Sequence, residues 1–441
     1  MSGLSVVGPN IDRAFRIFDS YLDGPADHPV GVAVSGGGDS VALLYALALW
    51  GKRPLEVLCV DHGLNPASGQ WTASVAAHAE AVDAHFTALK WIGDKPKTGL
   101  SAAARAARHA LLADAARQKG IRVLCLAHTE DDIFEAQAMA EEGSNVATPA
   151  MWAPSPAWPD GRGVFLFRPF LGKRRGDLRS FLTARGVNWI DDPANGDRNS
   201  HRARVRQDRE PEDMVRFRLS LYLQPMSWMG GDLPELLLDA DTLGTHGMIV
   251  FDAAAFNAWP IAMARKRLAA AVVSAGGGNK LPRSDSVERL LANLASEDAQ
   301  TLCGARVRRQ GGRIEIVREA GELTRRGSTP MHLAPGVEKV WDGRFVVQTN
   351  TATVLRSSGE VRSGLSDADR AALQSLPAAL RTVLPVAENG KQKKLLLANP
   401  SLTQSPYKGI FCFSWVLYRF LAASGAFACE SDLCAAHEKA Q

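Results

Sequence analysis

The feature that most constrains the fold is a run of three glycines between a strand and a helix. Val30–Ser35 (VGVAVS) is typical of a buried strand, and Ser40–Trp50 is typical of a helix. Gly36, Gly37 and Gly38 lie between them. Because glycine adopts backbone angles that other residues avoid, several N–H groups can converge here on one anion. The positive end of the following helix adds to this attraction, so the loop is predicted to bind phosphate.

Two well-known phosphate loops do not match this segment. It lacks the Gly-Lys-Ser/Thr ending of a Walker loop and the G-x-G-x-x-G spacing of a dinucleotide fingerprint. The acidic Asp39 suits a loop in which Mg²⁺ mediates the contact with phosphate, and it is a candidate metal ligand. The alternative is a plain tight turn capped by Asp39 and Ser40, which three consecutive glycines disfavour.

Apolar runs alternate with helical stretches through the first part of the chain. Further strands are expected at Leu55–Asp61, His85–Trp91, Arg122–His128 and Val164–Phe167, and further helices at Ala73–Ala84, Ser101–Gln118, Asp131–Glu142 and Lys173–Arg185. This alternation predicts an α/β fold with a doubly wound parallel sheet covered on both faces. Ligands bind beyond the carboxyl ends of such strands, here at Ser35–Ser40, Asp61–Gly63 and His128–Glu135.

The remainder of the chain has a different pattern. Pro149–Gly163 is typical of a loop, and residues 210–300 are typical of helices. From residue 301 onward, hairpins are expected around Gly311-Gly312 and Asp342-Gly343. Later helices are expected at Asp367–Gln374 and Phe411–Leu421. We therefore predict a nucleotide-binding catalytic domain over 1–209, a helical domain over 210–300 and a mixed α+β module over 301–441.

Composition limits where the protein can be located and what it can bind. The six cysteines form neither a disulfide framework nor a zinc pattern, and no apolar run is long enough to span a membrane. With no secretory signal at the N-terminus, a cytoplasmic location is expected. The net charge is only +4, but Arg162–Arg209 holds twelve Lys or Arg against five Asp. Such a run is typical of a nucleic-acid contact or of a solvated helix face, and both interpretations stay open.

The loop S-G-G-x-D-S resembles the pyrophosphate loop of ATP pyrophosphatases, which cleave ATP to AMP and pyrophosphate while activating a carbonyl oxygen. Further motifs follow in order at Val60–Leu64 (VDHGL), Gly99–His109, Ala127–Glu135, Arg168–Leu171 (RPFL) and Trp189–Asn195 (WIDDPAN), followed by arginines 202, 204 and 206. This ordered set, over about residues 28–206, resembles the tRNA(Ile)-lysidine synthetase family.

The resemblance implies an adenine nucleotide alpha-hydrolase-like fold and a specific reaction. The family binds the isoleucine tRNA whose anticodon is CAU, and ATP adenylates the 2-carbonyl oxygen of its wobble cytidine. The ε-amino group of free lysine then displaces AMP and leaves lysidine. ATP, Mg²⁺, lysine and this tRNA are therefore the expected cofactors and partners.

Candidate residues for nucleotide binding and catalysis cluster at the three strand ends. The expected ATP contacts are Ser35, Gly36, Gly37, Gly38, Asp39, Ser40, Asp61, His62 and His128. Asp39, Asp132 and Glu135 are the candidate catalytic residues. Because Asp132 and Glu135 are three apart on one helical face, both can hold Mg²⁺, bind the lysine ammonium or accept its proton. The alternatives are a helix turn rich in acids at its positive end, and a satisfied polar pair at Asp61 and His62.

Arginines supply the candidate contacts with the tRNA backbone. Arg105 and Arg108 are expected one turn apart on a helix. The same role is expected for Arg168, Arg175, Arg202, Arg204 and Arg206. A guanidinium offers paired donors that match phosphate, although a solubilising basic edge is an equally good interpretation of any one of them.

Some positions depart from the family pattern. Ile133 and Ala136 stand where polar residues are usual, and Glu142 stands where arginine is usual. A non-catalytic tRNA-binding relative is therefore one alternative. Another is a tRNA 2-thiolation enzyme, but such chemistry generally needs paired cysteines, and Cys59 and Cys125 occupy strand interiors. The sequence leaves open which side chains bind lysine and whether the chain forms a homodimer.

Overall fold

The computed structural model describes residues 9–143, 148–191, 246–294, 298–325, 330–390, 392–398 and 409–434. The chain divides into two compact units. Unit 1 comprises Met1–Met229 together with Ala428–Leu433, and unit 2 comprises Gly230–Phe427 together with Cys434–Gln441. Within the described ranges, no helix is both long enough and apolar enough to cross a lipid bilayer.

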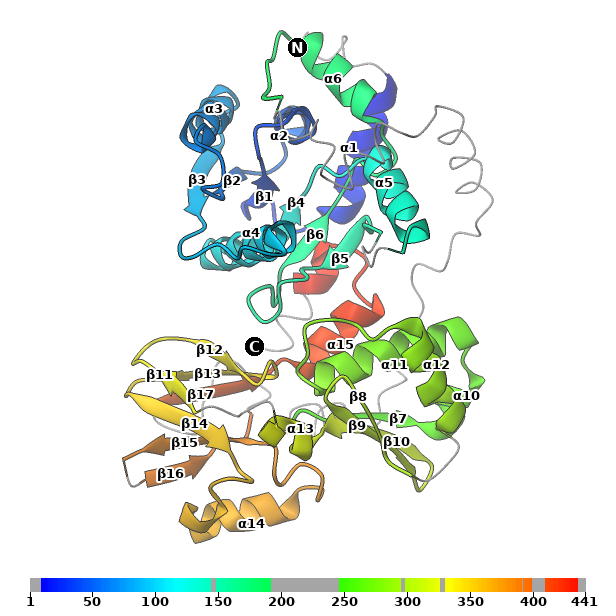
Figure 1. Ribbon diagram of the computed structural model, residues 1–441, viewed down its shortest axis with the longest axis vertical. Helices are drawn as coiled ribbons and strands as arrows, with labels where there is room; N and C mark the ends of the chain where they lie inside the picture. The colour runs from blue at the N-terminus through cyan, green and yellow to red at the C-terminus, as the bar shows by residue number, and fades with distance from the viewer. Residues whose placement is uncertain are drawn as a thin grey trace. The chain divides into compact units, whose positions relative to one another are not determined.

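Unit 1 is built on a six-stranded sheet in the order β3-β2-β1-β4-β6-β5 (Figure 1). Five strands are parallel, namely β1 (Val30–Ala33), β2 (Leu55–Asp61), β3 (His85–Lys90), β4 (Val123–Cys125) and β6 (Phe165–Phe167). The register places Val32 opposite Val57 on β2 and Cys125 on β4. The predicted α/β fold is confirmed, because these five strands pair in parallel and helices connect them.

Helices cover both faces of this sheet (Figure 1). They are α1 (Pro9–Tyr21), α2 (Gly38–Trp50), α3 (Ser68–Ala81), α4 (Leu100–Gln118), α5 (Glu130–Glu141) and α6 (Arg175–Thr183). On β6, Leu166 packs into a core with Leu112 of α4, whereas the next residue, Phe167, meets the ring of Phe18 from α1. Successive side chains of a strand point to opposite faces, so burial on both faces explains why the strands are apolar throughout.

Two expectations for unit 1 are wrong in detail. Pro149–Gly163 was expected to be a loop, but it contains β5 (Trp152–Pro154), which pairs antiparallel with β6 at the edge of the sheet. Pro154 is compatible with this edge position, where one backbone face pairs with no neighbour. The strand expected over Arg122–His128 is shorter, Val123–Cys125, so that His128 lies in the turn before α5.

Unit 1 also includes a segment from far along the chain, Ala428–Leu433. Glu430 pairs with Arg53 through two hydrogen bonds of 2.9 and 3.1 Å, and both side chains are only 2% exposed. Arg53 also donates from Nε to the His28 carbonyl, 2.7 Å away and two residues before β1. Gly24 has no room for a side chain, since a Cβ there would lie 2.5 Å from Glu430 Cδ. The segment is therefore an integral part of the unit.

Unit 2 contains a four-stranded antiparallel sheet in the order β7-β10-β9-β8. Its strands are β7 (Ile249–Asp252), β8 (Gln300–Leu302), β9 (Ala305–Gln310) and β10 (Arg313–Arg318), and the nearby helices are α10 (Ala253–Ala258), α11 (Ile261–Ala275), α12 (Ser284–Asn293) and α13 (Ala320–Arg325). Phe251, Leu268 and Ile314 share its core. Because β7 precedes residue 300 and pairs with β10, the predicted boundary at residue 300 passes through this sheet. The boundary predicted near residue 209 lies outside the described residues.

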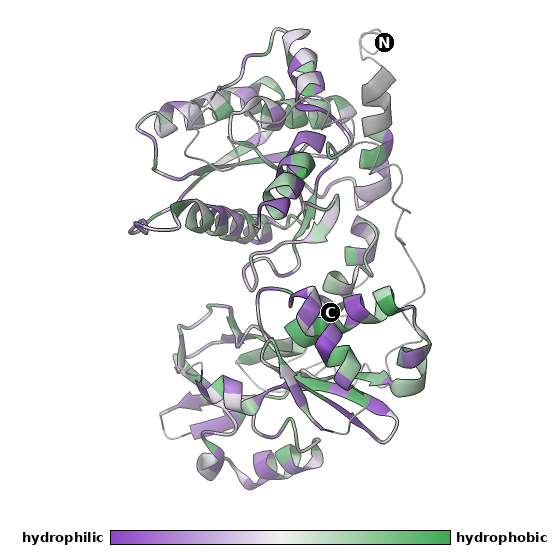
Figure 2. Ribbon diagram, turned by 45° about the vertical axis from the view of Figure 1, so that its right-hand side comes forward, coloured by the Kyte–Doolittle hydropathy of each residue, from purple (hydrophilic) through white to green (hydrophobic). Residues whose placement is uncertain are grey.

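Two smaller antiparallel sheets complete unit 2. One contains β11 (Met331–Leu333), β14 (Thr353–Ser357), β15 (Pro385–Asn389) and β16 (Gln392–Leu395), and the other contains β12 (Lys339–Trp341), β13 (Phe345–Thr349) and β17 (Ile410–Ser414). The 3-10 turn η4 (Arg362–Gly364) and α14 (Asp367–Ser375) follow β14. Figure 2 shows that hydrophilic and hydrophobic residues mix along these strands, as antiparallel sheets with one solvated face require.

Both predicted hairpins of unit 2 are confirmed. β9 and β10 pair around Gly311-Gly312, and β12 and β13 pair around Asp342-Gly343, with positive φ at all four turn residues. The helix expected over Phe411–Leu421 is partly wrong, because its first residues belong to β17 and α15 spans Val416–Ser424. A short apolar run is compatible with either element, and here pairing with β13 decides for the strand.

Candidate active site at the glycine loop

The glycine loop leads directly from β1 into α2 and exposes the start of that helix. Gly37 is the N-cap residue, and no side chain caps this end of the helix. Ser40 instead stabilises the loop from within, since its Oγ donates to the Gly37 carbonyl at 2.8 Å and accepts from the Ser35 N–H at 3.2 Å. The positive end of α2 is therefore left open to an anion, as predicted for a phosphate loop.

Two of the glycines pack so closely against Trp189–Asp191 that a side chain at either position would crowd this segment. Gly36 has a φ of +90°, and a Cβ there would lie 2.5 Å from Ile190 Cδ1. A Cβ on Gly38 would lie 3.3 Å from the indole of Trp189. The Ile190 N–H also donates to the Gly36 carbonyl at 2.9 Å. The segment Trp189–Asp191 thus forms one wall of the loop.

Replacing Gly36 by alanine should lower the free energy of unfolding by about 1–3 kcal/mol, because alanine is strained at positive φ. Gly37→Ala is the matched control, since φ is −69° there and the nearest atom to a Cβ is 3.7 Å away. That change should be neutral or stabilise the protein by up to about 1 kcal/mol. Urea denaturation of both variants measures the difference, and equal losses would contradict this account of the loop.

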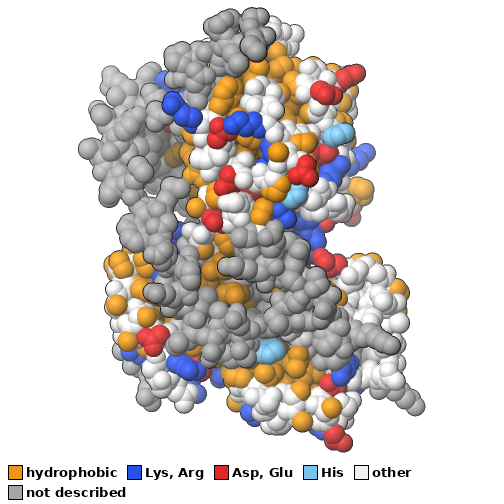
Figure 3. Space-filling model, turned by 180° about the vertical axis from the view of Figure 1, so that it is seen from behind, with side chains coloured by type: hydrophobic (Ala, Val, Ile, Leu, Met, Phe, Trp, Pro, Cys, Tyr) orange, Lys and Arg blue, Asp and Glu red, His pale blue; other side chains and the backbone are white. Residues whose placement is uncertain are grey.

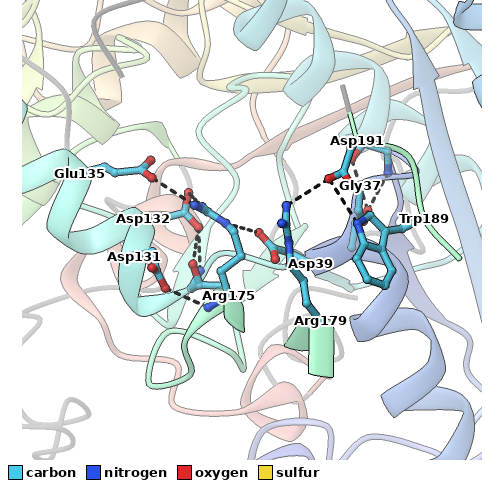
Figure 4. Close-up of polar contacts among 12 residues, drawn as sticks. Gly37, Asp39, Asp131, Asp132, Glu135, Arg175, Arg179, Trp189 and Asp191 are labelled. Carbon is cyan, nitrogen blue, oxygen red and sulfur yellow. Dashed lines mark hydrogen bonds and ion pairs between the residues drawn. The ribbon is translucent and has the colours of Figure 1, made fainter. Parts of the chain in front are cut away.

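Three carboxylates converge on one guanidinium beside the loop (Figure 4). The Nε of Arg175 donates to Asp39 at 3.0 Å, and its Nη1 donates to Glu135 at 3.3 Å. Its Nη2 lies 3.8 Å from Asp132. Burial by itself would lower the pKa of Arg175, but Asp39 and Glu135 outweigh this effect and raise it. The candidate catalytic residues are therefore brought together, around an arginine that was expected to contact tRNA.

The Asp39 carboxylate is only partly paired by Arg175. Burial raises the pKa of its carboxyl group above the ordinary value, and the charge of Arg175 only partly opposes that shift. Its second oxygen, Oδ1, is buried and has no hydrogen-bond partner among the described residues. An orphaned carboxylate oxygen at the mouth of a phosphate loop suits a cation that phosphate also ligates.

The start of α5 positions the other two acids. Thr129 is the N-cap of α5, and Asp132 closes a capping box by accepting from the Thr129 N–H at 2.8 Å and its hydroxyl at 2.9 Å. Glu135 lies one turn on and is buried. Asp132 thus caps the helix and also faces the site, so the structural and the functional interpretations both apply to it.

Two cavities meet at the carboxyl end of β1. The loop cavity has a volume of about 360 Å³ and is lined by residues that include Gly38, Asp39, Asp132, His128 and Arg175. The β2 cavity has a volume of about 450 Å³, and Asp61, His62, Val60 and Trp71 are among its lining residues. The three strand ends singled out from the sequence therefore surround adjoining spaces, as a topological switch point requires.

Asp61 and His62 sit at the end of β2 as expected, with different surroundings. Asp61 accepts the Gly63 N–H at 2.7 Å, which holds the turn after the strand. His62 packs edge-on against Trp91, and its Nδ1 is buried without a hydrogen-bond partner in the described part of the chain. Burial lowers the pKa of His62, and Arg108 lowers it further. His62 therefore presents an imidazole ring with a lowered pKa at the cavity wall.

The predicted tRNA-binding arginines divide into distinct groups. Arg105 and Arg108 lie one turn apart on α4, and both line the loop cavity. Arg168 is buried, where its Nη1 donates to the Ala150 carbonyl at 2.7 Å, and burial lowers its pKa to about 10. A contact between Arg168 and tRNA stays a prediction. Arg202, Arg204 and Arg206 lie outside the described residues.

Residues 12–212 match the family model described as a PP-loop domain. A tRNA(Ile)-lysidine synthase of Caulobacter vibrioides is 40% identical over 382 residues, covering 85% of this chain and 88% of that protein. The chain belongs to the tRNA(Ile)-lysidine synthase family. This confirms the resemblance inferred from the order of the motifs.

Other relatives agree with the family. A tRNA(Ile)-lysidine synthase of Rhizobium meliloti is 33% identical and covers 73% of this chain and 74% of that protein. Among solved structures, a U34-tRNA thiolase from Methanococcus maripaludis matches with a TM-score of 0.40 and 16% identity, over 51% of this chain and 83% of that one. An NMN synthetase from Francisella tularensis matches with a TM-score of 0.33 and 11% identity, over 50% of this chain and 97% of that one.

Two cysteines of this lysidine synthase family member, Cys59 and Cys125, lie in the interior of unit 1. All six are free thiols, and Cys59 and Cys125 are buried within strands. Burial raises the pKa of Cys59 to about 11 and raises that of Cys125 further. In the described ranges, no cluster of His, Cys, Asp or Glu is arranged to hold a metal ion. Reactive thiols need a lowered pKa, so these residues are unsuited to sulfur transfer.

Sequence reasoning missed Arg179 and Asp191. Arg179 donates to Asp191 at 3.2 Å and lies over the ring of Trp189 (Figure 4). Arg179 and Asp191 both line the loop cavity. The signal was present, because Arg179 follows Arg175 by one turn on α6.

On the face seen in Figure 3, described basic and acidic side chains are interspersed.

Proposed function

We propose that the chain ligates free lysine to the 2-position of the wobble cytidine in the CAU-anticodon isoleucine tRNA. The observation that carries this proposal is the convergence of Asp39, Asp132 and Glu135 on one cationic group beside a glycine loop. Such a site offers the open start of α2 to phosphate, and Asp39 and Asp132 line the same cavity, with Glu135 held beside them by Arg175. A reaction in which ATP activates a carbonyl oxygen and an amine then displaces AMP needs both phosphate-binding groups and a proton acceptor.

In the first step, the 2-carbonyl oxygen of cytidine attacks the α-phosphorus of ATP, and pyrophosphate leaves. The open start of α2, with Gly37 and Gly38, receives the negative charge of the leaving group. Asp39 is the proposed ligand of Mg²⁺, supported by its orphaned oxygen. When bound there, Mg²⁺ would supply positive charge to the pyrophosphate oxygens.

In the second step, the ε-amino group of lysine attacks carbon 2, and AMP leaves. The amine must lose a proton first, since an ammonium has no free lone pair. We assign that proton to Glu135, because Asp132 is engaged by Thr129 at the start of α5. Asp132 then serves to orient the ammonium group before the transfer.

The tRNA contacts are proposed on the same basis. Arg105 is exposed beside the loop cavity and is suited to a backbone phosphate. Arg202, Arg204 and Arg206 are proposed for the same role from their pattern alone. Because its proposed substrates are tRNA and free lysine, and because all six thiols are free, we place the reaction in the cytoplasm.

The proposal is tested by reconstituting the reaction with purified protein, ATP, Mg²⁺, lysine and a CAU-anticodon tRNA transcript. The expected result is AMP release and a lysidine nucleoside detected by mass spectrometry. The same transcript with a GAU anticodon is the matched control, and it should give neither product. A thiolated nucleoside would favour the 2-thiolation alternative, and tRNA binding without AMP would favour a non-catalytic relative.

A further inference from the structure

Arg108 is a cation on α4 that lines the loop cavity. Arg108 forms no ion pair or hydrogen bond with any residue that the structure describes, in contrast to Arg175 nearby. Burial lowers the pKa of the Arg108 guanidinium, and the positive charge of nearby Arg105 lowers it further. A desolvated, unpaired guanidinium costs free energy unless a ligand supplies the missing anion. Arg108 is therefore suited to bind an anionic ligand.

Its position restricts what that anion can be. Arg108 lines the loop cavity and the β2 cavity, and it also lines a third, smaller space with His62 and His128. The two larger cavities otherwise share Ala33, Ser35, Gly37 and Ile190, which belong to the end of β1, the loop and its wall. Arg108 thus stands where the two spaces meet.

The two cavities differ in a way that orients a nucleotide. The β2 cavity has apolar walls from Leu58, Val60 and Trp71, which suit a base and a sugar. The loop cavity contains the open end of α2 and Asp39, which suit the pyrophosphate group. ATP bound across both has its α-phosphate at the shared wall, because that phosphate links the two parts of the molecule.

We propose that Arg108 is a catalytic residue that binds the α-phosphate of ATP and stabilises the charge that develops on it in both steps. The proposal rests on the proposed function. In the first step a bond forms from the cytidine oxygen to the α-phosphorus while the bond to the β-phosphate oxygen breaks. In the second step the bond from carbon 2 to the phosphate oxygen breaks, and AMP leaves with that electron pair. A fixed guanidinium next to the α-phosphate stabilises both transition states.

The rival interpretation is the tRNA backbone contact expected from the sequence. Arg105, which is exposed one turn earlier on α4, is better placed for that role than the more enclosed Arg108. Buried His109 adjoins Arg108 in the chain, and burial with the charges of Arg105 and Arg108 lowers its pKa to about 3. His109 therefore adds no further charge, and the positive potential in this part of the site comes from the arginines.

The first test measures binding without any turnover. Arg108→Gln should weaken the binding of ATP and of AMP by about 10–100-fold, because each carries the α-phosphate. It should leave the binding of adenosine and of pyrophosphate unchanged. Asp39→Asn should weaken ATP without weakening AMP, and Arg117→Gln, also on α4, should affect neither. Calorimetric titrations of the full chain give these affinities.

The second test separates a catalytic role from a contact with tRNA. Arg108→Gln should lower kcat for AMP formation by about 10²–10³-fold with little change in KM for tRNA. The wild-type protein should discriminate between the two diastereomers of ATPαS, and Arg108→Gln should lose that discrimination. The melting temperature of the unliganded protein should not fall, because no ion pair is lost and the cost of the unpaired guanidinium is removed.

The outcomes distinguish this inference from the proposed function. If Arg108→Gln raises KM for tRNA and leaves AMP binding intact, Arg108 is a backbone contact and the inference is wrong. If nucleotide affinities and the diastereomer preference are unaffected, it is also wrong. If the wild-type protein forms no lysidine but Arg108→Gln still loses AMP, the proposed function fails while the assignment of Arg108 to the α-phosphate stands.

Discussion

Replacing Asp39 by asparagine should lower the rate of AMP formation by about 10²–10³-fold, the usual loss when one preorganised charge is removed from a reacting phosphate. Asparagine has almost the same shape, so the loop and its hydrogen bonds around Ser40 remain. What changes is the charge that opposes the cation beside the pyrophosphate. The apparent affinity for Mg²⁺ should fall in parallel, and a titration of Mg²⁺ in single-turnover assays measures both effects.

The same substitution should not destabilise the fold. Burial raises the pKa of Asp39, so the folded state binds a proton more tightly than the unfolded state does. A raised carboxyl pKa means that stability falls as pH rises through that pKa, and the ionised group is a cost at neutral pH. Arg175 keeps Glu135 and Asp132 as partners. The free energy of unfolding at neutral pH should therefore be unchanged or higher in the variant.

Asp114→Asn provides the charge-matched control, since Asp114 contacts Arg117 and Gln118 at the surface of α4. It should leave AMP formation and stability close to those of the unmodified protein. Undiminished product formation with Asp39→Asn would show that Asp39 has no part in the reaction. A large loss of stability would instead show that the carboxylate holds the loop together.

Replacing Glu430 by alanine should destabilise unit 1 by about 3–5 kcal/mol, because it leaves the buried Arg53 without its counter-charge. The neighbouring pair of Lys52 and Asp19 is the control, since both side chains are well exposed. Lys52→Met should cost less than about 1 kcal/mol. Hydrogen exchange of the amides of β1 reports on unit 1 directly, because the Arg53 side chain also holds the chain just before that strand.

A double substitution tests the reason for the loss. Arg53→Met combined with Glu430→Leu removes both charges and restores apolar contact, so most of the lost stability should return. If the double variant is no more stable than Glu430→Ala, the cost arises from packing and not from an unpaired charge. If Glu430→Ala is as mild as Lys52→Met, the segment Ala428–Leu433 contributes little to unit 1.

Much of unit 1 was predicted from short stretches of sequence, because its strands and its glycine loop each have a pattern within a few residues. A fully apolar strand such as Val30–Ala33 reflects burial on both faces, and the glycine loop reflects one positive φ and two close contacts. The spacing of Asp132 and Glu135 likewise followed from helical geometry, and both acids point into the site.

What escaped prediction depends on contacts between distant parts of the chain. Arg168 is interior because a carbonyl eighteen residues before it accepts its hydrogen bond. Arg175 belongs to the carboxylate cluster because α6 packs beside α2, which the sequence does not state. The apolar run Phe411–Ser414 is a strand because β13 is available to pair with it. In each case an arginine or an apolar run is ambiguous until its partner is known.

The pairing of Arg53 with Glu430 also sets an order of events during synthesis. Glu430 is added to the chain 377 residues after Arg53. At ordinary rates of translation, about 20–75 s pass between the synthesis of Arg53 and that of Glu430. The nascent nucleotide-binding unit therefore spends that time with a cation that it cannot yet bury, and it completes its core only when the ribosome has made almost the whole described chain. A chaperone or a polyanion near the ribosome has that interval in which to act on it.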